Sequence, residues 1–259
     1  MLKIFIIERK RAEKKLIINA EELKTINEKL ESLDRMKDEF LSNVSHELKT
    51  SLVSIAGYSN VLSDGTLGEL NDRQKKDMNI IKRNSVRLEH LIDSILYLSI
   101  EKSGRMQYIF KPLQITDVIN KSILDMTPQI KGNSLKINKD FSDNLPLIQA
   151  DENRIMQVMI NLIGNAIKFT PSGGIMISVH DDGHYLHVAV SDTGVGVPKN
   201  IISDLFERFY QGDASTKRRY GGTGLSLHIS KLIVEAHKGS IWAESEEGVG
   251  TTIHFTLPK

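Results

Sequence analysis

The first 56 residues contain neither proline nor glycine, and this absence constrains the fold more than any other feature of the sequence. Apolar residues in this stretch recur at alternating steps of three and four, as in a parallel coiled coil. They are Leu23, Ile26, Leu30 and Leu33, followed seven residues later by Phe40. We therefore expect a helix from about residue 9 to residue 62 whose apolar seam is buried in a dimer. The alternative is an amphipathic helix packed on its own domain.

A second helix is expected after residues 63–70, where SDGTLGEL supplies two glycines and an aspartate that end the first helix. Asn71 is suited to capping the N-terminus of this second helix. Its apolar residues again recur at near-heptad spacing, at Ile81, Leu88, Leu91, Ile95 and Leu98. Two antiparallel helices in each chain of a dimer predict a four-helix bundle.

His46 lies on the first helix, two residues from both Val44 and Leu48, which belong to an apolar stripe. An offset of two residues turns the imidazole about 200° away from that stripe, so we expect it to face solvent. Glu47 is adjacent, and Thr50 lies one turn further along the same outward face. An exposed neutral imidazole is a nucleophile, and a neighbouring carboxylate can orient it and take its proton. The arrangement suits a phosphoryl acceptor; a merely solvated helix face is the alternative.

After Ser103 and Gly104 the long helical periodicity gives way to shorter segments. We expect strands at residues 107–110, 135–141, 175–180, 186–191, 240–243 and 251–257, and helices at residues 115–130, 151–168 and 225–237. This order predicts an α+β sandwich, in which helices pack on one face of a mixed sheet. The expected fold is therefore an all-α antiparallel helical hairpin, forming a dimeric four-helix bundle, followed by this sandwich.

The helix expected at residues 151–168 carries Asn161, Asn165 and Lys168 within about 60° of one another around its axis. Its other positions are so apolar that the helix must be largely buried, and buried amides need partners. An asparagine carbonyl is a hard ligand suited to Mg²⁺, and a lysine beside it suits a phosphate. For one such helix, a solvated polar edge is the alternative interpretation.

Two glycine-rich turns follow this helix. Asp192 ends an expected strand and is followed by Gly194 and Gly196. Such an aspartate caps a turn, or it accepts a hydrogen bond from an exocyclic amino group while the glycines let a ligand approach the backbone. Further on, Gly222 and Gly224 directly precede a helix whose free N–H groups suit an anion.

The segment between the two turns, LFERFYQGDASTKRR, is too polar and basic to be buried. It brings Lys217, Arg218 and Arg219 within reach of phosphates. We expect this segment to act as a mobile lid.

Composition excludes several classes of protein. The 34 basic and 33 acidic residues give a net charge of +1. No overall electrostatic field therefore favours binding to nucleic acid or to an anionic membrane. The absence of cysteine removes disulfides, thiolate catalysis and cysteine zinc sites, and it suits a reducing cytosol. No apolar run approaches the roughly 20 residues needed to span a bilayer. We expect a cytoplasmic chain, with any membrane anchor upstream of Met1.

The segment FLSNVSHELKT closely resembles the phospho-acceptor box of two-component sensor histidine kinases, whose H-E-x-[KR]-T core is matched at His46, Glu47, Lys49 and Thr50. The resemblance implies that His46 is phosphorylated, that Glu47 is the base assisting autophosphorylation, and that Thr50 positions water for the reverse phosphatase reaction. Ser51 stands where the family usually has proline, which bends the helix. We therefore expect a straighter helix, and the departure bears on any switching between kinase and phosphatase states that depends on the bend.

Residues 1–15 are expected to begin as a short β run that passes into a charged helix. The segment FIIERKRAEKKL is similar to the junction that follows PAS sensor domains. This resemblance implies that the chain begins at the last strand of a missing sensor; a solvated helix start is the alternative.

The asparagine helix, the aspartate–glycine turn, the lid and the second glycine loop resemble, in that order, the ATP-binding fold shared by histidine kinases, gyrase, the Hsp90 chaperones and mismatch-repair ATPases. The resemblance spans residues 112–259. It implies that Asn165 holds Mg²⁺, Lys168 a phosphate, Asp192 the adenine amino group, and Gly222 with Gly224 the phosphates. Further residues expected to line the nucleotide site are Asn161, Gly194, Gly196, Lys217, Arg218, Thr223 and Leu225.

Gyrase-like ATPases resemble this helix but carry glutamate at the position of Asn161, where it activates water. An amide cannot act as that base, so the γ-phosphoryl group is preserved for transfer to an imidazole. The resemblance also implies that Phe206 and Phe209 form an aromatic box at the base of the lid. Ser226 replaces a usual glycine, with little expected effect.

These expectations describe a dimeric sensor histidine kinase core. Residues 1–36 form a coiled-coil linker, residues 37–103 a dimerisation and phospho-acceptor domain, and residues 104–259 an ATP-binding catalytic domain. ATP and Mg²⁺ serve to phosphorylate His46, and the phosphoryl group passes to an aspartate on a response-regulator receiver domain. The alternatives are a nucleotide-binding pseudokinase or phosphatase-biased module, and a gyrase-class ATPase.

Overall fold

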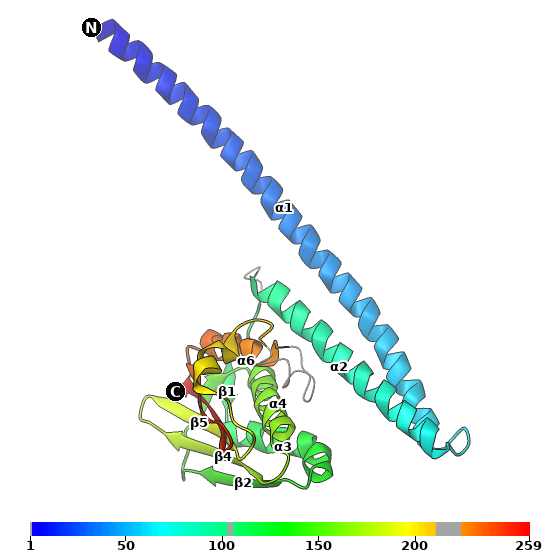
Figure 1. Ribbon diagram of the computed structural model, residues 1–259. Helices are drawn as coiled ribbons and strands as arrows, with labels where there is room; N and C mark the ends of the chain where they lie inside the picture. The colour runs from blue at the N-terminus through cyan, green and yellow to red at the C-terminus, as the bar shows by residue number, and fades with distance from the viewer. Residues whose placement is uncertain (1, 103–105, 211–223) are drawn as a thin grey trace. The chain divides into compact units, whose positions relative to one another are not determined.

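The computed structural model describes residues 2–102, 106–210 and 224–259 (Figure 1). The chain divides into two compact units, Met1–Met106 and Gln107–Lys259. The first unit holds two long helices, and the second combines a sheet with shorter helices.

The first unit is an antiparallel hairpin of α1 (Leu2–Ser63) and α2 (Asp72–Lys102), as the sequence predicted. The Ser99 hydroxyl donates to the Asp38 carboxylate at 3.0 Å and so joins the end of α2 to the middle of α1. The expected β run at the start of the chain is wrong, because the backbone is helical from Leu2 onwards. No turn residue separates this segment from the rest of α1, and a lone strand has no partner for its backbone groups.

The start of α2 is fixed by a reciprocal pair of hydrogen bonds. Asn71 Oδ1 accepts from the backbone N–H of Gln74, and Gln74 Oε1 accepts from the backbone N–H of Asn71, both at 2.9 Å. This pairing satisfies two of the N–H groups that a helix end leaves free. The prediction that Asn71 caps the second helix is confirmed.

The two helices meet along a seam that repeats every seven residues on each of them. Its members are at most 7% exposed and are Ser45, Leu52 and Ser59 on α1 and Ser85, Ile92 and Ser99 on α2. Serine is small, so the backbones can approach, and its hydroxyl can donate to a carbonyl one turn back, as Ser59 does to Ile55 at 2.7 Å. The apolar pattern of the sequence does not reveal this seam, because four of its six members are polar.

The coiled-coil positions of α1 take no part in this seam. Each of them is more than half exposed: Leu23, Ile26, Leu30, Leu33 and Phe40. The N-terminal part of this stretch extends past the end of α2 (Figure 1). The alternative of a helix that buries its apolar stripe on its own hairpin is therefore wrong for these residues.

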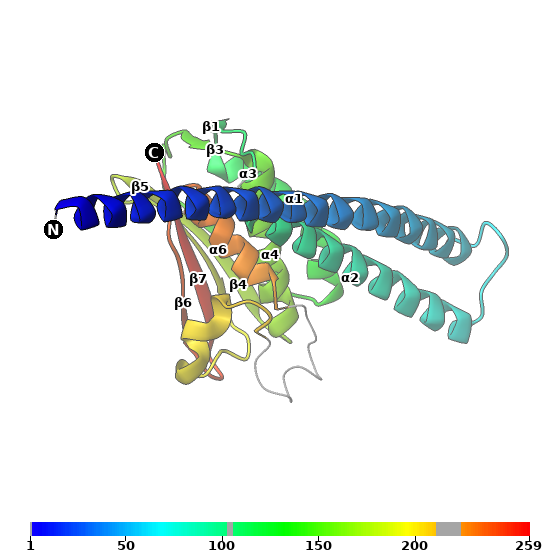
Figure 2. The same cartoon turned by 90° about the horizontal axis from the view of Figure 1, so that it is seen from above.

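The second unit is an α+β sandwich, as predicted. Its elements are β1 (Lys111–Leu113), α3 (Ile115–Gly132), β2 (Lys136–Phe141), β3 (Ile148–Ala150), α4 (Glu152–Phe169), β4 (Gly174–Asp181), β5 (Tyr185–Asp192), the 3-10 helix η1 (Lys199–Phe206), α6 (Ser226–Ala236), β6 (Ile241–Glu246) and β7 (Gly250–Pro258). Five strands form a mixed sheet in the order β2-β4-β5-β7-β6, in which only β2 and β4 are parallel. Figure 2 shows α3, α4 and α6 on the same side of this sheet.

Three short elements differ from the prediction. Residues 107–110 have no regular structure, and the strand there begins at Lys111. The backbone N–H of Ile109 donates instead to Asp151 Oδ2, at 2.9 Å. Neither β3 nor η1 was expected, because three residues of strand and one 3-10 segment are too short to give a clear period.

His237, at the C-terminal end of α6, anchors the segment that enters the second unit. Its ring is 3% exposed and lies edge-on to Tyr108 and Phe110, with ring centroids 5.5 and 5.0 Å away. The Nε2 atom lies 3.0 Å from the backbone N–H of Asp151, and Nδ1 lies 2.8 Å from the carbonyl of Ile233. Because an N–H must donate and a carbonyl must accept, the ring is neutral and carries its proton on Nδ1.

Burial lowers the pKa of His237, and the carbonyl of Ile233 and the charge of Asp151 only partly oppose this. The folded chain therefore takes up this proton at a lower pH than the unfolded chain. Consequently the free energy of unfolding must fall as the pH drops below about 6.5, by about 1.4 kcal/mol for each unit by which the pKa is lowered.

We predict that His237→Gln, which keeps a donor and an acceptor but cannot titrate, loses less stability between pH 7 and pH 5 than the wild type. Urea unfolding of the whole chain at both pH values measures this difference. Burial also lowers the pKa of His254, but that residue contributes equally to both proteins. His184→Gln, at an exposed position, is the control and should keep the wild-type slope. An unchanged slope in His237→Gln would contradict the assignment.

Candidate functional site

His46 is exposed on α1, as its spacing predicted, with Glu47 and Thr50 exposed beside it. Its neighbour Ser45 is 5% exposed and belongs to the seam with α2. Successive helical residues are rotated by about 100°, so burial of Ser45 holds the imidazole clear of the hairpin interior. The ring is therefore open to a reacting partner.

The turn that follows His46 contains hydroxyls that bond back to the helix. Thr50 Oγ1 donates to the carbonyl of His46 at 3.0 Å, and Ser51 Oγ donates to the carbonyl of Glu47 at 3.1 Å. α1 continues through Ser51 without a break. Thr50 has used its only hydrogen within the helix, so its oxygen can act towards a ligand only as an acceptor.

α4 presents one polar edge and buries the rest of its surface. Its buried residues are Ile155, Val158, Met159, Leu162, Ile163, Ala166 and Ile167. Asn161, Asn165 and Lys168 lie together on the partly exposed edge, as predicted. The side chain of Asn165 has no hydrogen-bond partner in the described part of the chain. An amide oxygen without a protein partner suits a hard cation that also binds phosphate oxygens.

Asn161 is already bonded to α6. Its amide nitrogen lies 3.2 Å from the carbonyl of Ser226 and 3.3 Å from the hydroxyl of Ser230. Ser226 is the first residue of α6, so this contact brings the asparagine edge of α4 to the N-terminus of α6. These partners are 65 and 69 residues away, so no local sequence pattern indicates them.

Asp192 ends β5, as predicted, and its carboxylate is an acceptor in a half-buried position. Oδ1 accepts from the backbone N–H of Gly194 at 2.8 Å. Burial raises the pKa of the Asp192 carboxyl, and hydrogen bonds from the backbone N–H groups of Gly194 and Thr251 and from the side chain of Thr170 oppose that rise. The remaining acceptor capacity suits a ligand that offers an N–H group.

The turn after Asp192 passes directly over the C-terminal end of α4. A Cβ atom on Gly194 would lie 2.3 Å from the carbonyl oxygen of Phe169 and 2.6 Å from Asp192 Oδ1, so only glycine fits. The backbone N–H of Val195 donates to the same Phe169 carbonyl at 3.1 Å. The Asp192 turn is thereby fixed beside the end of α4 that carries Lys168.

The second glycine loop is only partly described. Gly224 has a φ of +68°, and a Cβ atom there would lie 2.6 Å from Phe209 C and from the carbonyl oxygen of Tyr210. Leu225 is fully buried at the start of α6. The predicted site residues Lys217, Arg218, Gly222 and Thr223 lie outside the described residues.

The two aromatic residues at the base of the expected lid differ in their surroundings. Phe206 is 8% exposed, which fits the expected aromatic box. Phe209 is 65% exposed and has a φ of +61°, so its ring does not pack into a box. The backbone of Phe209 lies close to Gly224, where an added Cβ atom would be 2.9 Å from the Phe209 Cα.

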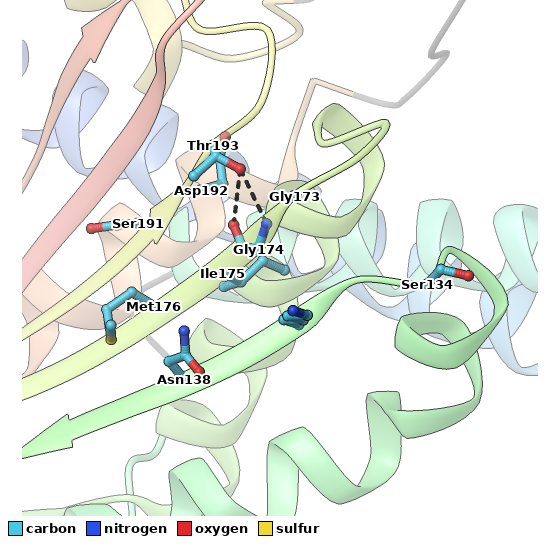
Figure 3. Close-up of a pocket in the computed structure, with 10 residues that line it drawn as sticks. Ser134, Asn138, Gly173, Gly174, Ile175, Met176, Ser191, Asp192 and Thr193 are labelled. Atoms are coloured by element: carbon cyan, nitrogen blue, oxygen red, sulfur yellow. Dashed lines mark hydrogen bonds between the residues drawn. The ribbon is translucent and has the colours of Figure 1, made fainter.

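A separate pocket of about 590 Å³ lies at the ends of β2, β4 and β5 (Figure 3). It is lined by Ser134, Lys136, Asn138, Gly173, Gly174, Ile175, Met176, Ser191, Asp192 and Thr193. Asn138, Met176 and Ser191 occupy paired positions on neighbouring strands. On β4, Met176 lies between the buried residues Ile175 and Ile177, so its side chain is on the opposite face of the sheet. The three paired side chains therefore point away from the helices, and of the predicted nucleotide residues only Asp192 borders this pocket.

No group of three or more histidines, aspartates and glutamates in the described ranges could hold a metal ion. On the polar edge of α4, the side chain of Asn165 offers an amide oxygen that suits such an ion, as does that of Asn161. In residues 2–102, 106–210 and 224–259, no helix is both long and apolar enough to cross a membrane.

Two family models match the chain. The first, "His Kinase A (phospho-acceptor) domain", covers residues 36–104, and the second, "Histidine kinase-, DNA gyrase B-, and HSP90-like ATPase", covers residues 150–259. His46 lies within the first match, and the asparagine edge, the Asp192 turn and the start of α6 lie within the second.

Curated relatives match almost the whole chain. The methyl sulfide methyltransferase-associated sensor of Methanosarcina acetivorans is 37% identical over 255 residues, which are 98% of this chain and 25% of the relative. The sensor histidine kinase WalK of Bacillus subtilis is 36% identical over 231 residues, which are 88% of this chain and 38% of the relative. The chain thus spans less than half the length of these relatives.

Solved structures give the same result. Full-length ShkA in complex with AMPPNP aligns with a TM-score of 0.67 and 28% identity, over 85% of this chain and 45% of ShkA. The histidine kinase ThkA in complex with the response regulator TrrA aligns with a TM-score of 0.58 and 25% identity, over 85% of this chain and 61% of ThkA. With both family matches in the same order as the two units, the chain belongs to the sensor histidine kinases.

Proposed function

We propose that this chain phosphorylates itself on His46 with ATP and passes the phosphoryl group to an aspartate of a response-regulator receiver domain. The observation that carries the proposal is the exposed imidazole of His46 beside Glu47, in a chain whose residues 150–259 match the family model of histidine kinase-, DNA gyrase B- and HSP90-like ATPases. The ShkA and ThkA structures, with AMPPNP and with a response regulator, support the same two partners for this chain.

The first step is an in-line phosphoryl transfer. A neutral ring nitrogen of His46 attacks the γ-phosphorus of ATP, and the new N–P bond forms as the bond to the bridging oxygen breaks. ADP leaves with the electron pair of that bond. The proton on the other ring nitrogen passes to Glu47 or to water, which leaves a neutral phosphorylated ring.

Residues of the second unit hold and orient the nucleotide. Asp192 accepts from the adenine amino group, and Lys168 with the first turn of α6 faces the phosphates. Gly194, Gly196, Gly224 and Leu225 shape the turns. Lys217, Arg218, Gly222 and Thr223 are proposed for the same site from the sequence alone. Mg²⁺, when bound through the oxygen of Asn165, would neutralise charge on the β- and γ-phosphates.

Asn161 keeps the nucleotide from being hydrolysed. Its amide nitrogen is committed to Ser226 and Ser230, and an amide has no basic group that could take a proton from water. The γ-phosphoryl group therefore stays available for the imidazole. In the reverse direction, Thr50 can hold an attacking water only through its oxygen, because its hydroxyl hydrogen is bonded to the carbonyl of His46.

The working form is a homodimer. Apolar residues remain uncovered on the outer face of α2, with Leu88 and Ile95 each 44% exposed, and α1 leaves Phe40 65% exposed. These residues continue the heptad stripe, and two hairpins that share the stripe would form a four-helix bundle.

We predict that incubation with γ-labelled ATP places an acid-labile, base-stable label on the wild-type chain and none on His46→Gln. The variant keeps a polar side chain on an exposed helix face, so the fold should be unaffected. His184→Gln, an exposed histidine of the second unit, should label normally. Multiple-turnover ATP hydrolysis that persists in His46→Gln would instead favour a gyrase-class ATPase.

We also predict that the wild-type chain has about twice its monomer mass of 29.1 kDa in light scattering. Leu88→Asp combined with Ile95→Asp should give a monomer, because the charges would be buried in the bundle without partners. Leu124→Asp, at a position 71% exposed on α3, is the control and should stay dimeric. A wild-type monomer, or a double variant of unchanged mass, would be incompatible with this dimer.

A further inference from the structure

Ser230 is a fully buried polar residue on α6 whose hydroxyl makes two hydrogen bonds. Its Oγ donates to the carbonyl of Ser226 at 2.9 Å and accepts from the amide nitrogen of Asn161 at 3.3 Å. The same amide nitrogen donates to the carbonyl of Ser226 at 3.2 Å. The Ser230 hydroxyl and the Ser226 carbonyl, 2.9 Å from each other, lie on the same side of the amide nitrogen, so the NH₂ group of Asn161 faces both of them.

These contacts determine which way the Asn161 amide faces. The carbonyl of Ser226 can only accept, and the single hydrogen of the Ser230 hydroxyl is directed at that carbonyl. The group of Asn161 that faces both must therefore be the NH₂ group. Its oxygen is turned away from α6, on the α4 edge that also carries Asn165 one turn further on.

The same contacts explain why an amide stands at this position. An aspartate has the same shape but offers no hydrogen, so its oxygen would face the carbonyl of Ser226 at the distance of a hydrogen bond. Two acceptors in a buried contact repel each other and leave both without partners. An amide can hold α6 through its nitrogen and still present an oxygen to the opposite side.

We infer that Ser230 is a positioning residue of the nucleotide site, which orients Asn161 so that its oxygen is presented to the cation accompanying the triphosphate. The inference rests on the proposed function, because it assumes that ATP binds at this edge with a divalent cation. Without the hydroxyl, the amide nitrogen keeps only the Ser226 carbonyl as its acceptor on α6, so the amide is held less firmly and its oxygen is less well fixed.

The test compares nucleotide affinity with and without the cation. ADP binding to the full chain is measured by calorimetry in Mg²⁺ and in EDTA, for the wild type and for Ser230→Ala. We expect affinity to fall about three- to tenfold in Mg²⁺, the effect of one hydrogen bond, and to stay unchanged in EDTA. A purely structural role would weaken binding equally in both conditions.

Two further variants separate the hydrogen bond from packing. Ser230→Cys keeps the shape of the side chain with a slightly larger atom but is a poor hydrogen-bonding group, so it should lose affinity in Mg²⁺ as Ser230→Ala does, even if the alanine variant folds badly. Ser122→Ala is the matched control. Ser122 is equally buried and donates to the carbonyl of Val118 at 2.8 Å, but it bonds no asparagine, so its loss should leave the affinity in Mg²⁺ unchanged.

The outcomes distinguish this inference from the function on which it rests. Wild-type affinity that Mg²⁺ does not enhance would overturn both the proposed cation site and the inference. Mg²⁺-enhanced binding that is the same in Ser230→Ala, Ser230→Cys and the wild type would overturn the inference alone. An equal loss in Mg²⁺ and in EDTA would likewise reject the orienting role of Ser230.

Discussion

The burial of one side of α4 against the sheet and its neighbouring helices is the constraint on which the second unit depends. Seven apolar residues of this helix are buried, so its polar edge is fixed in direction. Both glycine turns are then tied to that helix. The Asn161 amide holds the start of α6, and the carbonyl of Phe169 receives the turn after Asp192. The positions of the candidate nucleotide residues thus follow from the packing of one helix.

The first unit is held together in a different way, by a seam that repeats every seven residues on each of its two helices. Its hairpin is joined by a narrow seam of serines around Leu52 and Ile92, and serine contributes little apolar area. Of the larger side chains, Tyr97 is buried, whereas Leu88 and Ile95 lie on another face, where a second chain can cover them. In the proposed dimer these residues would add buried area on association, so dimerisation and stability would be linked.

Periodicity predicted the long elements well, and it failed where the structure depends on contacts between distant residues. The apolar spacing of α1, α2 and α4 and the cap at Asn71 were sufficient to locate these helices. The β run at the N-terminus was wrong because a short apolar segment has the same pattern in a strand and in a helix. No local pattern reveals the exposed ring of Phe209 or the close approach of its backbone to Gly224.

The candidate site likewise combines features that the sequence predicts with features that depend on contacts between distant residues. The asparagine edge and the Asp192 turn could be predicted, because a polar stripe on an apolar helix and an aspartate before glycines are visible in the sequence. The role of Ser230 could not, since a serine within an apolar helix gives no sign that its hydroxyl meets an amide from another element. Hydrogen bonds between distant segments become visible only once the backbone is placed.

Ser51 stands where the family usually has proline. It affects the turn of helix that follows His46 through its side-chain hydroxyl as well as through its backbone N–H. Proline would remove a backbone donor and clash with the carbonyl of Glu47. Ser51 keeps its backbone N–H and adds a hydroxyl donor to that same carbonyl, while Thr50 and Ser54 donate to the carbonyls of His46 and Thr50. Such hydroxyls compete with the backbone for its acceptors and slightly destabilise a helix. The turn of helix that follows His46 is thus continuous but slightly destabilised by these hydroxyls. A change in helix curvature there therefore does not require a proline.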